Sequence, residues 1–281
     1  MNIVHPRSLP EAVAALHDRP DGQLLAGGTD FMVEVNFGHR RPAAVVGLRR
    51  VADLKGYQIT PDEVVLRAGL TYREMEHELA PELPVLAQAA RTVGSPQIRN
   101  AGTLGGNLGT ASPAGDTLPA LAALDARVVL ASVAGLRTLP LSEFITGPKR
   151  NARRPDEVIT EVRVRRARGP QQFLKVGTRN AMVIAIASCA LVLDLQSRTL
   201  RCGLGSVGPV PIRPTQAEAF IATEIKWDLL SARPSAVERF AELVAEAARP
   251  ITDQRGTAEY RRHAVRVIAR RALERSLAHV G

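Results

Sequence analysis

Two glycine-rich segments constrain this chain more than any other feature. The first, AGGTD at Ala26–Asp30, directly follows Gln23–Leu25, an apolar run that predicts a strand. The second, GTLGGNLGTASPAGD, spans Gly102–Asp116. Glycine reaches backbone conformations with φ > 0 and lets a ligand approach where a Cβ would block it. Successive N–H groups in such turns form concave anion sites that need no lysine.

Polar side chains are interleaved with the glycines of both segments. Hydroxyl groups come from Thr29, Thr103, Thr110 and Ser112, and Asn107 contributes an amide. A single Gly-Gly pair after a strand is usually a plain turn, but a bare turn has no use for two stretches of polar backbone so poor in Cβ atoms. Together the segments predict a site for a cofactor that carries phosphate groups.

Helix caps and apolar periodicity predict an α+β fold in three units, 1–50, 51–168 and 169–281. Ser8–Glu11 and Thr71–Glu74 match the capping box that begins a helix. The glycine-rich stretch 94–115 predicts a loop, and in the last unit strands precede helices. The other predicted strands are 2–5, 44–48, 64–68, 127–131, 137–140, 158–164, 188–195 and 199–207; the other predicted helices are a short one toward Phe37 and 84–92, 118–124, 215–222, 235–248 and 257–280.

The net charge of +9 raises nucleic acid as a partner. The basic residues concentrate in Lys149–Arg168, where they alternate with Val and Ile, and in Arg261–Arg275, where they fall beside an apolar stripe of helical spacing. These patterns are typical of a strand and a helix with one solvated or subunit-facing side. No aromatic stacking platform or zinc pattern accompanies the charge, so we expect no nucleic-acid binding.

The cysteines and the apolar runs limit the remaining classes. The chain has two cysteines, Cys189 and Cys202, and no CxxC, whereas an iron–sulfur cluster normally takes four thiolates. We expect two buried thiols and no metal ligands here. No run approaches the roughly 18 apolar residues of a membrane span. Met1–Pro10 holds no apolar segment of signal-peptide length, which predicts a cytoplasmic protein.

A third glycine pattern, GLGSVG at Gly203–Gly208, matches the dinucleotide-binding fingerprint GxGxxG. That site requires a helix to begin inside the motif. The next residues, Pro209–Pro214, contain three prolines and cannot open a helix. We therefore interpret this motif as a turn.

The two glycine-rich segments carry a family resemblance. Ala26–Asp30, together with Val93–Asn100 and the residues that run on through Asp116, resemble the FAD-binding subunit of the xanthine dehydrogenase and carbon monoxide dehydrogenase family of molybdenum hydroxylases. Weaker similarity spans the rest of the chain, including Glu157–Thr160 and Phe173–Val176. The resemblance implies two α/β subdomains of the PCMH-type FAD-binding fold, then a C-terminal three-stranded sheet with a helical bundle.

The resemblance also implies where FAD binds. It places the pyrophosphate on Leu24–Phe31 and Thr103–Asn107, and Lys175 as a cation that balances charge on a reduced flavin. Neither segment contains a His or Cys for covalent attachment, so the FAD is expected to be non-covalent. The cysteine-bearing insertion of the aryl-CoA reductase branch is absent. No catalytic residue is assigned, and the expected cofactor contacts are Leu24, Leu25, Ala26, Gly27, Gly28, Thr29, Asp30, Phe31, Val93, Thr103, Leu104, Gly105, Gly106, Asn107, Ser112, Asp116, Ile159 and Lys175.

The function that the resemblance implies is electron transfer. Substrate is oxidised on a molybdopterin-binding large subunit, electrons cross the 2Fe-2S clusters of a small subunit, and FAD on this chain passes them to NAD, a quinone or oxygen. The expected assembly is a dimer of heterotrimers. One alternative is a stand-alone FAD oxidoreductase of the related oxidase fold. Such an enzyme would need its own substrate site with a catalytic Tyr, His or Arg, but Tyr57, Tyr72 and Tyr260 lie outside both glycine-rich segments. The other is a basic scaffold without flavin.

Overall fold

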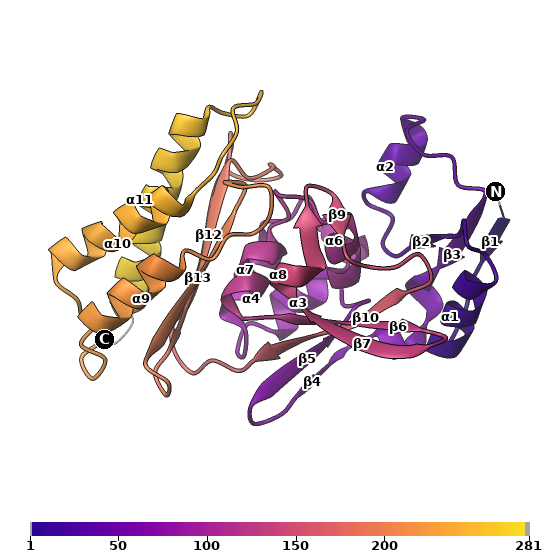
Figure 1. The fold of residues 1–281 in the computed structure, drawn as a ribbon, viewed down its shortest axis with the longest axis horizontal. Helices are drawn as coiled ribbons and strands as arrows, with labels where there is room; N and C mark the ends of the chain where they lie inside the picture. The colour runs from indigo at the N-terminus through magenta and orange to yellow at the C-terminus, as the bar shows by residue number, and fades with distance from the viewer. Residues whose placement is uncertain (1, 279–281) are drawn as a thin grey trace.

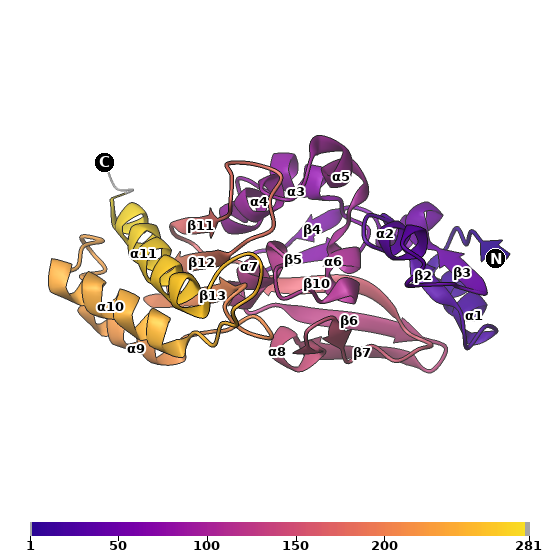
Figure 2. The same cartoon turned by 90° about the horizontal axis from the view of Figure 1, so that it is seen from above.

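The computed structural model describes residues 2–278. Three larger sheets and one two-stranded sheet form an elongated molecule, and Figure 1 shows the N-terminal sheet at one end and the C-terminal helices at the other. Figure 2 shows that the five-stranded sheet occupies the middle, between these two ends. The architecture agrees with the predicted α+β class.

The first sheet is parallel, in the order β1 (Asn2–Val4), β3 (Ala44–Gly47), β2 (Gln23–Leu25). Helix α1 (Leu9–His17) connects β1 to β2 and begins where predicted, because the Ser8 hydroxyl accepts the Glu11 N–H at 3.4 Å. The Glu11 carboxylate accepts from Arg7 N–H at 2.8 Å, not from Ser8 as a complete capping box would require. The chain leaves the carboxyl end of β2 directly into the first glycine-rich segment, which is followed by α2 (Phe31–Asn36).

The second sheet is antiparallel, in the order β4 (Tyr57–Ile59), β5 (Glu63–Arg67), β10 (Val158–Arg165), β6 (Arg127–Ser132), β7 (Gly135–Pro140). Two 3-10 turns, η1 (Leu48–Arg50) and η2 (Ala52–Leu54), lead into it from β3. In β10, Val162 and Val164 are buried while Arg163 and Arg165 are exposed, which confirms the predicted strand with one solvated side. The elements gathered on the other side are α3 (Tyr72–Glu78), α4 (Pro84–Arg91), α5 (Pro96–Ala101), α6 (Leu104–Thr110), α7 (Thr117–Ala123), α8 (Leu141–Phe144), β8 (Ile145–Gly147) and β9 (Arg150–Asn151).

The prediction of a loop at 94–115 is wrong, because this stretch contains α5 and α6. Ser95 and Thr103 cap the two helices by accepting the backbone N–H of the third helical residue. Glycine disfavours helices by about 1 kcal/mol per residue, so local propensity alone indicates a loop. Leu104 and Leu108 are fully buried in the core, and this packing holds α6 in place.

The third sheet is antiparallel, in the order β11 (Gln171–Val176), β12 (Ala187–Asp194), β13 (Thr199–Gly205). All of β12 is buried, because the sheet is covered on both faces. Cys189 and Leu191 pack against α9 (Thr215–Glu224), α10 (Pro234–Ala247) and α11 (Ala258–Leu277), while Ala190 and Val192 join the core of the central unit. The end of the helix predicted at 257–280 lies outside the described residues.

The GxGxxG pattern at Gly203–Gly208 lies at the end of β13, and the prediction that it opens no helix is confirmed. Its glycines are needed for packing: a Cβ on Gly203 would lie 2.0 Å from the Pro119 carbonyl oxygen, and one on Gly205 would lie 2.5 Å from the Ser188 hydroxyl. Glycine at these positions lets β13 press against α7.

We expect Gly203→Ala to destabilise the protein by about 1–3 kcal/mol, because the added methyl forces β13 away from α7. The free energy of unfolding in urea measures this, with Arg201→Ala on the same strand as control. Loss of nucleotide binding at unchanged stability would contradict the packing role and restore the dinucleotide interpretation.

Candidate cofactor-binding site

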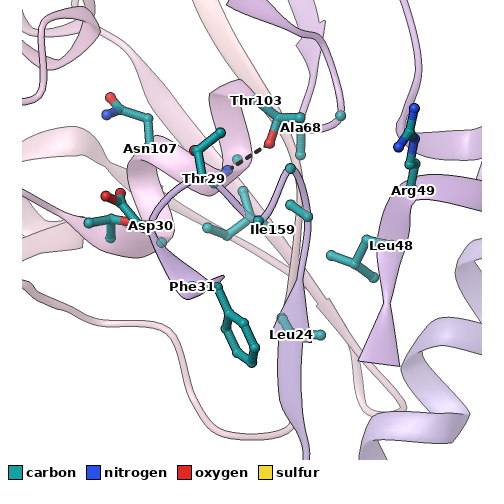
Figure 3. A pocket seen from close by; sticks show the side chains of 18 of the residues that line it. Leu24, Thr29, Asp30, Phe31, Leu48, Arg49, Ala68, Thr103, Asn107 and Ile159 are labelled. Atoms are coloured by element: carbon teal, nitrogen blue, oxygen red, sulfur yellow. Dashed lines mark hydrogen bonds between the residues drawn. The ribbon is translucent and has the colours of Figure 1, made fainter. Parts of the chain in front are cut away.

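A cavity of about 700 Å³ opens between the first sheet and the central unit, which consists of the five-stranded sheet and the helices packed on it. Its size suits a cofactor, since ligand pockets usually measure about 300–1,000 Å³. Both glycine-rich segments line it, and Figure 3 shows Thr29 and Asp30 close to Thr103 and Asn107. The predicted site residues that line the cavity are Leu24, Ala26, Gly27, Gly28, Thr29, Asp30, Phe31, Thr103, Gly105, Gly106, Asn107 and Ile159.

Six other predicted residues do not line this cavity. Leu104 is fully buried in the core, and the Ser112 hydroxyl accepts the Ala114 N–H at 3.3 Å within the turn after α6. Leu25 ends β2, and Val93 packs at the edge of the main core. Asp116 and Lys175 form a buried pair of their own, described below. The cofactor contacts assigned to these residues stay predictions.

The first glycine-rich segment offers free backbone donors. Among residues 2–278, no backbone or side-chain atom accepts a hydrogen bond from the N–H groups of Gly27, Gly28 or Thr29. Gly28 has φ +77°, a conformation that favours glycine. A Cβ on Gly27 would lie 1.9 Å from the Ala101 carbonyl oxygen, so only glycine lets this segment touch α5. Three adjacent unpaired N–H groups beside a cavity suit a phosphate anion.

The second segment differs from its prediction, because its backbone donors are already used. At the start of α6, Leu104 N–H donates to a carbonyl on the chain before α3 at 2.9 Å, and Gly105 N–H donates to Ala68 O at 2.7 Å. Gly106 N–H donates to the Thr103 hydroxyl at 3.0 Å, as Figure 3 shows. The expectation of open N–H groups therefore holds for the first segment and is wrong for residues 104–106.

Gly106 instead supplies a bare wall. A Cβ on Gly106 would lie 3.0 Å from the Thr103 hydroxyl and 3.8 Å from the Ala26 Cβ, with no other neighbour within 4 Å. A larger residue at position 106 would therefore place its side chain in the space between the two segments. Gly105 has another role, because its Cβ would lie 2.8 Å from that of Ala68, where α6 packs on the end of β5.

The structure brings to the cavity several cations that the sequence did not single out. Arg40 and Lys149 both pair with Glu34, at 2.9 and 3.3 Å, and the Arg40 guanidinium lies 5.1 Å from the centre of the Phe31 ring. The other cavity-lining cations are Arg49, Lys55 and Arg153. Arg49 alone carried a usable signal, since it follows β3 at the same sheet edge as the first glycine-rich segment.

Tyr72 also lines the cavity, although it lies outside both segments in sequence. Its ring fills the space that a side chain on Gly102 would need, with a Cβ there only 2.6 Å from Cε2. Burial, followed by the Asp30 and Asp116 carboxylates, raises the pKa of Tyr72, so its hydroxyl is a neutral hydrogen-bonding group. The sequence signal was the complete capping box on Thr71, which fixes the start of α3 beside Thr103.

Asp116, the last residue of the second glycine-rich segment, forms an ion pair with Lys175, and neither side chain lines the cavity. Lys175 Nζ lies 2.5 Å from Asp116 Oδ2 and donates to Thr92 O at 3.2 Å, and both charged side chains are only 7% exposed. The second carboxylate oxygen, Asp116 Oδ1, is buried without a hydrogen-bond partner among the described residues. Burial raises the pKa of Asp116, and the nearby Lys175 ammonium opposes that rise. An unpaired buried acceptor is unusual and indicates a missing donor.

Among residues 2–278, no helix is both long and apolar enough to cross a membrane. No three His, Cys, Asp or Glu side chains in that range come together as metal ligands. Cys189 and Cys202 are buried in the C-terminal core with their sulfur atoms 3.6 Å apart.

Comparison with known proteins identifies the family. Residues 1–166 match the model of the FAD binding domain in molybdopterin dehydrogenase, and residues 172–276 match the CO dehydrogenase flavoprotein C-terminal domain. The nicotinate dehydrogenase FAD-subunit of Eubacterium barkeri is 33% identical over 77% of each chain. The carbon monoxide dehydrogenase medium chain of Hydrogenophaga pseudoflava is 29% identical over 95% of this chain and 94% of its own.

Solved structures give the same result. A structure of the Hydrogenophaga pseudoflava carbon monoxide dehydrogenase contains a chain that superposes with a TM-score of 0.88 at 28% identity, over 99% of this chain and 97% of that one. The fold predicted from the sequence is thus confirmed, as are the FAD-binding domain and the oxidoreductase class. Since the first model covers more than half of its length, the chain belongs to the family of FAD-binding subunits of molybdopterin dehydrogenases.

Proposed function

We propose that this chain binds FAD non-covalently and transfers electrons within a molybdenum hydroxylase complex. In this proposal a large molybdopterin subunit oxidises the substrate, and a small subunit carries the 2Fe-2S clusters. The FAD on this chain takes electrons from those clusters and delivers them to NAD, a quinone or oxygen. The complex is a dimer of heterotrimers, and its cytoplasmic location stays a prediction.

The observation that carries the proposal is the fit between the cavity and a diphosphate. The free N–H groups of Gly27, Gly28 and Thr29 offer a row of donors, and Gly106 leaves the opposite wall without a side chain. A diphosphate needs both features, since its oxygens accept several hydrogen bonds and its bulk excludes a Cβ.

The buried pair Asp116–Lys175 supports a place for the flavin ring. When bound, the flavin exchanges electrons one or two at a time, which lets it connect iron–sulfur clusters to two-electron acceptors. Asp116 Oδ1 is a buried acceptor with no hydrogen-bond partner among the described residues. The ring system of a flavin has an N–H group that could donate a hydrogen bond to it. Lys175 holds a positive charge at the same place, which favours electron density on a nearby ligand.

The relatives support a division of labour between chains. Their names describe an FAD-subunit and a medium chain, and the Hydrogenophaga structure is described as a carbon monoxide dehydrogenase that lacks the Mo-pyranopterin moiety of its molybdenum cofactor. This chain has only two cysteines, both buried in the C-terminal core. Four thiolates from another chain are therefore needed to hold each cluster. The flavin must then face a subunit boundary, and the C-terminal unit at 169–281 is the docking unit.

The proposal is tested by reconstitution. We expect the isolated chain to be folded and yellow but unable to oxidise nicotinate, carbon monoxide or any other hydroxylase substrate. Adding the molybdopterin and 2Fe-2S subunits that co-purify with it should restore turnover with the natural acceptor. The flavin-free pair of those subunits should still oxidise substrate with an artificial dye. Turnover of a substrate by the isolated chain would overturn the proposal in favour of a stand-alone oxidase. A colourless, folded chain that takes up no FAD would overturn it in favour of a basic scaffold without flavin.

A further inference from the structure

We infer that Arg153 binds the adenosine-phosphate half of FAD, and that the ion pair between buried Glu157 and half-buried Arg137 is the positioning unit that holds it there. The inference rests on the proposed FAD site and adds to it a cation that lies outside both glycine-rich segments. Arg153 lines the cavity from the connection between β9 and β10, on the same wall as Ile159.

The Arg153 side chain is held in place without being neutralised. Its Nη1 donates to three backbone carbonyl oxygens, those of Arg154 at 2.9 Å, Pro155 at 3.2 Å and Glu157 at 2.7 Å. No carboxylate among residues 2–278 accepts a hydrogen bond from it, and its Nε and Nη2 donate to no described group. Arg40 and Lys149, by contrast, already share Glu34. Arg153 therefore brings to the cavity wall a charge with no hydrogen-bonded carboxylate among the described residues, together with free donors.

Burial makes that charge costly until an anion arrives. Burial is the main cause that lowers the pKa of Arg153, and the carboxylates of Glu157 and Asp156 oppose it. An anionic ligand that accepts from Nε or Nη2 would compensate the charge and make a hydrogen bond of the stronger, charge-assisted kind.

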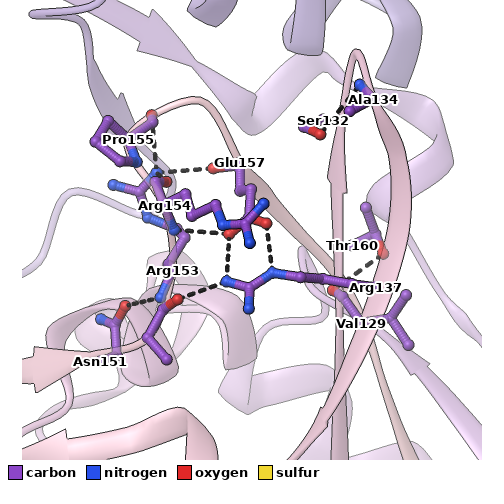
Figure 4. Close-up of polar contacts among 11 residues, drawn as sticks. Val129, Ser132, Ala134, Arg137, Asn151, Arg153, Arg154, Pro155, Glu157 and Thr160 are labelled. Carbon is purple, nitrogen blue, oxygen red and sulfur yellow. Dashed lines mark hydrogen bonds and ion pairs between the residues drawn. The ribbon is translucent and has the colours of Figure 1, made fainter.

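A network of buried contacts fixes the backbone that carries Arg153 (Figure 4). Glu157 is 2% exposed, and its carboxylate accepts from Arg137 Nε at 2.5 Å, from Arg137 Nη2 at 2.8 Å and from Arg154 N–H at 2.6 Å. Arg137 Nη2 also donates to Ala152 O at 2.6 Å. The two sides of the 152–157 turn are thus tied to one buried carboxylate.

The same turn is fastened to the end of α6. Asn151 Nδ2 donates to Gly109 O at 2.9 Å, and Asn151 Oδ1 accepts the Arg153 N–H at 3.0 Å. Lys149 N–H donates to Ala111 O at 2.9 Å. Arg153 therefore lies next to the C-terminal end of the helix whose start forms the diphosphate wall.

This position selects one half of the dinucleotide. The Asp116–Lys175 pair, the proposed flavin end, lies beside α4 and β11 through Thr92 and Lys175 itself. Arg153 belongs to a different stretch of wall, with Gly109 and Ile159. Burying the Glu157 carboxylate costs desolvation energy, which offsets much of its attraction to the half-buried Arg137. Holding one loop conformation for ligand binding gives the Glu157–Arg137 pair a reason to exist, because a preorganised donor loses less entropy on binding.

The test uses ADP as a probe, since ADP has the adenosine and both phosphates of FAD but no flavin. Calorimetric titration of the FAD-depleted chain should give an ADP affinity about tenfold to a hundredfold weaker for Arg153→Met, the loss expected for one charge-assisted hydrogen bond. FAD affinity should fall in parallel, whereas FMN affinity should change less than about twofold. Arg154→Met is the matched control, because Arg154 is the adjacent arginine and its side chain is exposed.

Two more variants separate binding from folding. Arg153→Lys keeps the positive charge but lacks the guanidinium fork. Its ADP affinity should therefore lie between those of the wild type and Arg153→Met. Glu157→Gln should weaken ADP binding severalfold without changing FMN binding, because it loosens the turn that carries Arg153. Melting temperatures of the depleted proteins show which variants are folded.

The outcomes are distinct. A wild-type chain that binds neither FAD nor ADP would overturn the proposed function itself. A wild-type chain that binds both, with folded Arg153→Met or Arg153→Lys binding ADP as tightly as Arg154→Met, would overturn only the role of Arg153. An equal loss of ADP and FMN affinity in the folded Arg153 variants would contradict the assignment to the adenosine half.

Discussion

The Gly106→Val protein is expected to fold and to contain no FAD. Within the protein, a Cβ at position 106 meets only the Thr103 hydroxyl at 3.0 Å and the Ala26 Cβ at 3.8 Å, and both can yield slightly. Valine is also no worse than glycine inside a helix. The branched side chain instead fills the space in which the diphosphate would lie, so we expect a loss of FAD affinity of at least about a hundredfold, the equivalent of one or two lost charge-assisted contacts plus steric exclusion.

The measurement is the ratio of visible flavin absorbance to protein absorbance, together with the melting temperature of the flavin-depleted chain. Gln97→Val on neighbouring α5 is the control, because Gln97 is exposed and lies outside the cavity. Gly106 is helical and has no positive φ, so the loss of binding comes from the space that the side chain fills and not from backbone strain. Stoichiometric FAD in a folded Gly106→Val protein would move the diphosphate away from α6.

The Lys175→Met protein is expected to be less stable by about 3–5 kcal/mol at neutral pH, which is the usual cost of removing one partner of a buried ion pair. Asp116 and Lys175 are each only 7% exposed, so water cannot take over the missing charge. Chemical denaturation gives the free energy of unfolding. Lys226→Met is the control, since Lys226 is an exposed lysine with no ion pair among the described residues.

The loss in Lys175→Met should depend on pH in a defined direction. Burial already raises the pKa of Asp116, and removing the ammonium that opposes this rise raises it further. A carboxyl whose folded pKa lies above its unfolded value, about 4, is protonated more readily in the folded state. Stability is therefore lost as pH rises from about 4 to the folded pKa, and the deficit against wild type shrinks toward acid pH.

A double variant provides the decisive comparison. Lys175→Met combined with Asp116→Leu removes both charges, and we expect it to recover most of the stability at neutral pH, since apolar replacement of a whole buried pair is often neutral or stabilising. A Lys175→Met protein that is as stable as wild type at every pH would show that the pair is solvated in solution.

Local sequence signals predicted most helix starts and strands. The capping box at Thr71 is complete in the structure, and Gln23–Leu25 is the strand that carries the first glycine-rich segment. These features are local, because a cap needs residues only three positions apart and a strand needs only its own alternation. The short strand β4 and the strand β11 were not predicted, since three polar-rich residues or a mixed polar run have no period to detect.

The glycine-rich stretch 94–115 shows where local signals fail. Its glycines predict a loop, yet α5 and α6 form because Ser95 and Thr103 cap them and buried Leu104 and Leu108 anchor α6. A contact that decides the outcome comes from Ala68, which follows strand β5 and accepts the Gly105 N–H. Propensity is a weak prior that such tertiary packing overrides.

By itself the sequence determined the cofactor class and the two glycine-rich segments that are predicted to approach it. Paired glycines among hydroxyl residues provide a polar backbone that a ligand can approach closely. This pattern is visible directly in residues 26–30 and 102–116. Only the tertiary structure decided which of them keep free N–H groups, that Tyr72 and Arg153 join the cavity, and that Asp116 and Lys175 are buried together. The physical reason is that conformational freedom belongs to each residue alone, whereas burial, pairing and charge compensation depend on neighbours that are distant in the chain.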